Sequence, residues 1–168
     1  KELYPTTTFG IGPAIDDGFY YDMDFGTEKI TEADLAKIEK KMRGIVKRGF
    51  TMERSEKSRN DALDWAIEGK QGLKKELIEE LPESETISFY TMVDLAGKTV
   101  FEDLCKGPHI AGSKEVGAFK LTKVAGAYWR GDEKRQMLTR VYGVAFATQE
   151  ELDEYLKRQE EAKARDHR

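Results

Sequence analysis

The hydrophobic and polar positions in residues 9–25 predict a β-hairpin. Hydrophobic side chains alternate with more polar ones over residues 19–25, and they share one face of a predicted strand: Phe19, Tyr21, Met23 and Phe25. Asp17 and Gly18 precede this strand and form a strong turn signal. The glycine-rich stretch 9–13 is typical of a strand that packs close to another backbone.

The period becomes that of a helix after Thr31. Hydrophobic residues then recur at three- and four-residue spacing, at Leu35, Ile38, Met42 and Ile45. Thr31 with Asp34 is a start signal and Gly49 a stop signal. The opposite face is basic, and we expect it to be solvated rather than to bind phosphates: Lys37, Lys40, Lys41, Arg43 and Lys47.

The remaining chain predicts two short helices, then mostly strands. A weak strand signal lies near 50–54, and Asn60 is a candidate cap for the first short helix. The second helix ends before Pro82. Strands follow at 86–92, 98–104, 117–124 and 137–146, with residues 126–132 as an aromatic loop between glycines. Thr148 begins a final helix with a capping box.

These elements predict an α+β fold, in which helices pack on one face of an antiparallel β-sheet. Strands outnumber helices, hairpin connections dominate, and no alternation of parallel strands with helices is present. The length of 168 residues suits one domain with an appendage. We place the domain at 1–147 and a helical linker at 148–168.

Composition narrows the classes of protein. The chain is 39% hydrophobic and 36% charged, with a formal net charge of −4, which excludes a globally basic nucleic-acid binder but not a local basic patch. A single cysteine excludes an intrachain disulfide framework. No long apolar run and no signal-peptide pattern is present, so we expect a cytoplasmic protein with no membrane partner.

Cys105 and His109 are the most informative candidate chemistry. The only cysteine lies four residues before one of two histidines, across Gly107 and Pro108. A thiol and an imidazole suit a soft metal or acid–base chemistry near neutral pH. A buried apolar cysteine beside an ordinary turn is the simpler interpretation, and this segment alone leaves both open.

Several segments together resemble the editing domain, or second additional domain, of bacterial-type threonyl-tRNA synthetases. They are residues 9–13, 17–22, 102–109, 126–132 (GAYWRGD), 140–143 (RVYG) and 165–168. The resemblance implies hydrolysis of tRNA(Thr) that carries serine, within a threonine–tRNA ligase. Its partners would be that acceptor end and the catalytic and anticodon-binding domains.

The family's site pairs a CxxxH turn with an HxxxH helix. Only the turn is present here, because His109 and His167 are the only histidines. Lys1 to Pro5 looks like the end of that helix, so we expect a fragment with little or no activity of its own and a monomer. A complete His₃Cys set would suit zinc; with two ligands at most, Cys105 and His109 are expected to hold no stoichiometric metal, and they could instead orient water and substrate.

The resemblance also implies roles for other residues. Lys74, with Lys75 as the neighbour that could be confused with it, would orient water or stabilise the oxyanion, and Asp103 would bind the seryl amino group. Tyr21 and, more weakly, Tyr90 would line the serine pocket. Each also has a simpler interpretation: either lysine as a solvated helix residue, Asp103 as a strand-end or turn carboxylate, and the tyrosines as core residues.

Residues 126–132 allow two interpretations. We expect Trp129 to be structural, since indoles are usually buried, and Arg130 could contact the tRNA acceptor end. The main alternative for the whole chain is a non-catalytic module that binds tRNA or links parts of a synthetase. A freestanding metal-binding domain is a third hypothesis.

Overall fold

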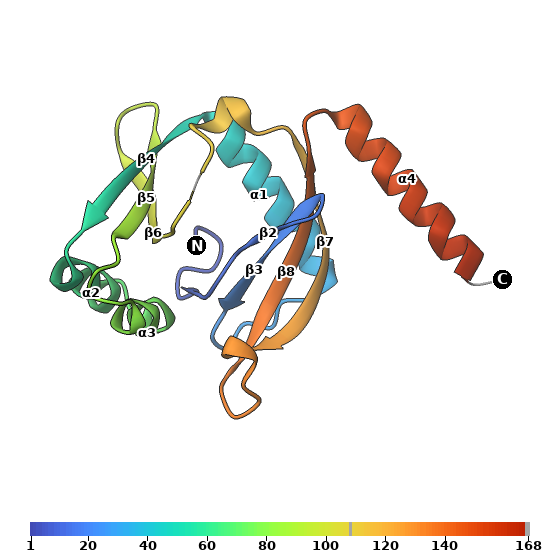
Figure 1. The fold of residues 1–168 in the computed structure, drawn as a ribbon. Coiled ribbons are helices and arrows are strands. Elements are labelled where there is room, and N and C mark those ends of the chain that lie inside the picture. The colour runs from blue at the N-terminus through green and yellow to red at the C-terminus, as the bar shows by residue number, and fades with distance from the viewer. Residues whose placement is uncertain (108, 167–168) are drawn as a thin grey trace.

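The computed structural model describes residues 1–107 and 109–166, and it confirms an antiparallel α+β fold (Figure 1). Its strands divide between two sheets, which the sequence analysis did not anticipate. The larger sheet contains β1 (Thr8–Phe9), β3 (Gly18–Asp24), β8 (Met137–Phe146) and β7 (Ala118–Tyr128) in that order, and β2 (Ala14–Ile15) also pairs with β3. The smaller sheet has the order β4 (Phe50–Lys57), β5 (Ile87–Asp94), β6 (Thr99–Leu104).

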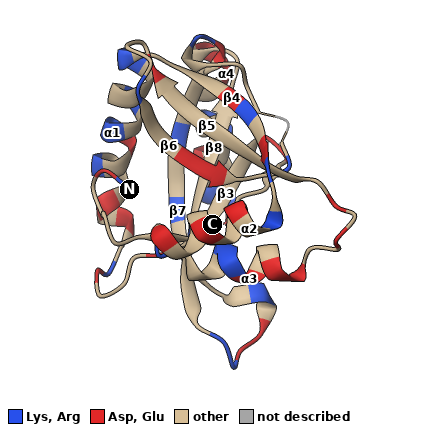
Figure 2. Cartoon of the chain, turned by 90° about the vertical axis from the view of Figure 1, so that its left-hand side faces the viewer, with Lys and Arg blue, Asp and Glu red and all other residues tan. Residues whose placement is uncertain are grey.

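Helix α1 (Leu35–Arg48) follows a short 3₁₀ turn at Glu32–Asp34 and packs on the larger sheet. Leu35 forms a buried cluster with Leu121 and Val141, and the predicted strand face adds Phe19 and Met23. The capping box of Thr31 and the stop at Gly49, where φ is +87°, are as predicted. Helix α1 carries six cations and one acid, Glu39, which is buried. Figure 2 shows the basic residues as blue bands along this helix.

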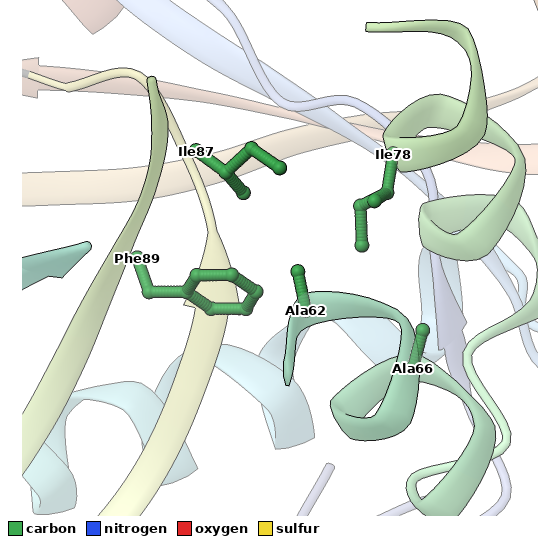
Figure 3. Close-up of a cluster of buried hydrophobic side chains, with 5 residues drawn as sticks. All are labelled: Ala62, Ala66, Ile78, Ile87 and Phe89. Atoms are coloured by element: carbon green, nitrogen blue, oxygen red, sulfur yellow. The ribbon is translucent and has the colours of Figure 1, made fainter. Parts of the chain in front are cut away.

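Helices α2 (Arg59–Glu68) and α3 (Gly72–Glu80) pack against the smaller sheet. Their core contains Ala62, Ala66, Ile78, Ile87 and Phe89 (Figure 3). Ser58 caps α2 by accepting a hydrogen bond from the Asp61 amide, so the prediction of Asn60 as the cap was wrong. Both residue types cap helices, and the chain turns into the helix two residues earlier than predicted.

The remaining elements are β7, which is longer than predicted, and the C-terminal helix. β7 extends through Tyr128, so the predicted loop at 126–132 is partly strand, followed by a 3₁₀ turn at Trp129–Gly131. β8 has the predicted bounds. The final helix, α4 (Gln149–Asp166), projects from the body of the molecule and is anchored by the buried Leu152 (Figure 1). Its role as a linker stays a prediction.

None of the helices in the described part of the chain combines the length and the apolar character needed to cross a bilayer.

Candidate functional site

The structure brings Cys105 and His109 into contact just after β6. The Cys105 Sγ lies 3.1 Å from His109 Nε2, and the Gly107 amide donates to the same sulfur at 3.4 Å. Gly107 has φ of +75°, a conformation that favours glycine and lets the chain fold back over four residues. Cys105 is half-buried and His109 is exposed, so the pair lies at the surface rather than in a sealed core. Pro108 lies outside the described residues.

Asp103 lies at the centre of a buried polar cluster beside this turn. The Tyr21 hydroxyl donates to Asp103 Oδ2 at 2.6 Å, and the Leu104 amide donates to Oδ1 at 2.9 Å. The Lys74 ammonium lies 3.5 Å from Oδ1 and donates to the Leu104 carbonyl at 3.3 Å. Three elements therefore converge here, with Tyr21 from β3, Lys74 from α3 and Asp103 from β6.

The electrostatics of the cluster follow from burial and the central carboxylate. Burial raises the pKa of Asp103, while Lys74 and the Tyr21 hydroxyl oppose that shift. Burial also raises the pKa of Tyr21, and the neighbouring Asp103 raises it further, so this phenol stays a hydrogen-bond donor. Partial desolvation in the turn lowers the pKa of His109, and the Asp103 charge opposes this shift. The lowered pKa favours a neutral imidazole at neutral pH.

Lys74 and Lys75 are distinguished by burial. The Lys74 side chain is 6% exposed and faces the cluster, whereas Lys75 is 46% exposed and pairs with Glu79 on the helix surface. The structure thus places Lys74 rather than its neighbour in the cluster.

Tyr90 reaches the turn rather than the Asp103 cluster. Its ring stacks on the His109 imidazole, with centroids 4.0 Å apart and planes inclined by 11°. The tyrosine comes from β5, where it is paired with Asp103 of β6.

Arg130 is the one predicted site residue that the structure brings to neither the Cys105–His109 turn nor the Asp103 cluster. Its guanidinium pairs with Glu80 and Glu76 on the surface of α3. Trp129 is buried and donates to Glu76 Oε2 at 3.1 Å, in keeping with the expected structural role.

The sequence analysis missed Ser88. This buried residue donates from its hydroxyl to the Cys105 carbonyl and accepts the Cys105 amide on its own carbonyl. A polar residue between Ile87 and Phe89 in an apolar strand was the available signal. A hollow of about 500 Å³ adjoins the turn, and its lining includes Arg54, Glu85, Ser88 and Lys106.

The donor set does not fit a structural zinc site. Zinc needs four ligands, or three with a water, and the turn supplies two. No group of three His, Cys, Asp or Glu side chains that could hold a metal occurs within residues 1–107 and 109–166.

Comparison with known proteins finds a family that matches part of the chain. Residues 87–142 match the family described as "Threonyl and Alanyl tRNA synthetase second additional domain". Tyr90, Asp103, Cys105, His109 and Arg130 lie inside this range, whereas Tyr21 and Lys74 lie outside it.

The chain is also similar over its whole length to threonine–tRNA ligases. It is 49% identical to that of Francisella philomiragia, and 51% identical to those of Clostridioides difficile and Clostridium novyi, over 168 residues in each case. The chain spans about a quarter (25%) of the length of these relatives. Residues 87–142 are therefore similar to the second additional domain of threonyl and alanyl tRNA synthetases, and the whole chain is similar to about a quarter of each of these threonine–tRNA ligases.

Proposed function

We propose that this domain removes serine from mischarged tRNA(Thr) by hydrolysing the ester bond. The observation that supports it best is the convergence of Tyr21, Lys74 and Asp103 beside the Cys105–His109 turn. Serine and threonine differ by one methyl group, which a binding pocket discriminates by only about 1–3 kcal/mol. A second site that hydrolyses the smaller, serine-charged product corrects the errors that this weak discrimination leaves.

Asp103 would bind the ammonium group of the seryl moiety. Its two oxygens offer about four lone-pair sites, of which the Tyr21 hydroxyl and the Leu104 amide occupy two. The Lys74 ammonium favours the ionised form of this carboxylate and opposes the rise in its pKa that burial causes. A further N–H donor can therefore join without displacing the existing partners.

His109 would take the proton from the attacking water. The Cys105 sulfur already accepts the Gly107 amide, and we assign the His109 Nε2 proton to the same sulfur. This tautomer leaves Nδ1 as the acceptor. The water oxygen bonds to the ester carbonyl carbon while Nδ1 takes the water proton. The carbon–oxygen bond to the ribose then breaks as Nδ1 gives this proton to the leaving ribose oxygen.

Lys74 would donate to the developing oxyanion. It is buried in the cluster and keeps one hydrogen bond, to the Leu104 carbonyl, besides its ion pair with Asp103. An ammonium in a partly dry site stabilises a new negative charge more strongly than it would in water. The turn supplies two ligands, which is too few for zinc, so the roles above are given to side chains of this chain alone.

The test is deacylation of seryl-tRNA(Thr) by this chain and by a form extended upstream by about one helix, on the order of 20 residues. We expect hydrolysis by the extended form, with little or none by the shorter one. Substituting Cys105 or His109 by Ala in the extended form should cost at least about tenfold in rate.

A matched pair of lysine variants provides the control. Lys74→Ala should lower the rate, whereas the exposed neighbouring Lys75→Ala should leave it unchanged. If the extended form binds tRNA but never deacylates it, the non-catalytic module becomes the better account.

A further inference from the structure

One face of β5 supports the Cys105–His109 turn. Ser88 and Tyr90 are two residues apart, so their side chains share a face of the strand, while Phe89 between them points into the core with α2. Tyr90 is paired across the sheet with Asp103, which places that carboxylate on the same face.

Ser88 fixes the start of the turn. Its carbonyl accepts the Cys105 amide at 3.1 Å, and its hydroxyl donates to the Cys105 carbonyl at 2.5 Å. The sheet pairing therefore continues one residue past the end of β6, with a side chain taking the place of a backbone donor. Cys105 is held at both of its backbone polar groups.

Tyr90 fixes the end of the turn. The imidazole of His109 lies parallel to the phenol ring, and a Cβ added to Gly107 would collide with the Tyr90 hydroxyl. Glycine is thus required at 107 both for its positive φ and for the close approach of the ring. His109 is exposed, so this stacking is the main restraint on its ring besides the Cys105 sulfur.

We infer that Ser88 and Tyr90 are positioning residues for the Cys105–His109 pair, and that Tyr90 does not itself bind substrate. The inference rests on the proposed function, in which His109 must be presented to a water in one orientation. An exposed imidazole samples several rotamers, and a displacement of about 1 Å can cost on the order of a hundredfold in rate.

The structural half of the inference is tested by NMR on this chain, without any assay of activity. The sequence has two histidines, and a His167→Gln variant assigns the resonances of His109. Stacking over Tyr90 shifts the His109 ring protons upfield. We expect Tyr90→Phe to keep this shift and Tyr90→Leu to abolish it, with thermal unfolding confirming that both variants fold. An unchanged shift in Tyr90→Leu would overturn the inference.

The functional half is tested by kinetics in the upstream-extended form. Tyr90→Leu and Ser88→Ala should each lower kcat by about tenfold or more with KM nearly unchanged, and Tyr90→Phe should restore kcat. A Tyr90→Phe variant with raised KM and normal kcat would show that the hydroxyl contacts substrate, against the inference. If the wild-type extended form does not deacylate seryl-tRNA, the proposed function fails, while the NMR result still decides whether Tyr90 holds the turn.

Discussion

Asp103 combines burial with three polar partners, and this combination is what a carboxylate needs to stay charged inside a protein. Tyr21 and the Leu104 amide donate to it, and Lys74 supplies the opposite charge. Its value to the proposed reaction is the negative charge. An amide of the same shape can still accept from the Leu104 amide, while the Tyr21 hydroxyl turns to accept from the new NH2 group, but the charge is lost.

Asp103→Asn is therefore expected to weaken binding of the seryl group while keeping the shape of the site. A hydrogen bond to a charged group contributes about 1.5–3 kcal/mol, so KM for seryl-tRNA should rise roughly ten- to a hundredfold. Deacylation kinetics in the extended form measure this. Asp64→Asn, at an exposed position on α2, is the matched control, and an equal effect in both variants would contradict the role of Asp103.

The pH dependence of deacylation is expected to follow His109. A general base must be neutral, and burial lowers the pKa of His109 below 6.5. The rate should thus rise with pH through a midpoint below 6.5 and be level at neutral pH. The pH profile of kcat/KM measures the midpoint. A midpoint clearly above 6.5, or an unchanged acid limb in His109→Ala, would contradict the assignment.

At the scale of elements, the connection between α2 and α3 ties the helical layer to the larger sheet. Gln71 is buried there, accepts the Phe9 amide at 3.0 Å and donates to the Thr7 carbonyl at 3.3 Å. α3 carries Lys74 and β1 leads to Tyr21. This one side chain therefore helps to set the distance between Lys74 and Tyr21 in the site.

Gln71→Ala is expected to destabilise the fold by about 1–3 kcal/mol, because the buried Phe9 amide loses its partner. Urea unfolding measures the change. Gln149→Ala, which removes an exposed contact with Asp153 on α4, should change the free energy of unfolding by less than about 0.5 kcal/mol. Equal changes in the free energy of unfolding would show that the Gln71 hydrogen bonds stabilise the fold no more than an exposed contact does.

Across the whole molecule, the sequence predicted the elements with strong periodicity, but it did not predict which strands pair. The bounds of β8, the Thr31 capping box just before α1 and the stop of α1 at Gly49 follow from local patterns. The division into two sheets does not, since alternation assigns residues to faces but does not say which strands pair. The spacing of Cys105 and His109 indicated a site, whereas Tyr21 and Lys74 were assigned by family resemblance, because long-range contacts leave no local signal.

The metal content of the whole chain is a further prediction. With Cys105 and His109 as the only paired ligands among the described residues, we expect no stoichiometric zinc. Metal analysis of protein purified without chelator measures it, with and without the Cys105→Ala substitution. One tightly bound equivalent that is lost in the variant would contradict the two-ligand description.

The most direct test of the central claim compares seryl-tRNA(Thr) with threonyl-tRNA(Thr) as substrates of the upstream-extended form, wild type and His109→Ala. The account predicts that wild type deacylates the seryl ester far faster than the threonyl ester, and that His109→Ala loses at least about tenfold of that rate. Equal hydrolysis of both esters, or full activity in the variant, would contradict it.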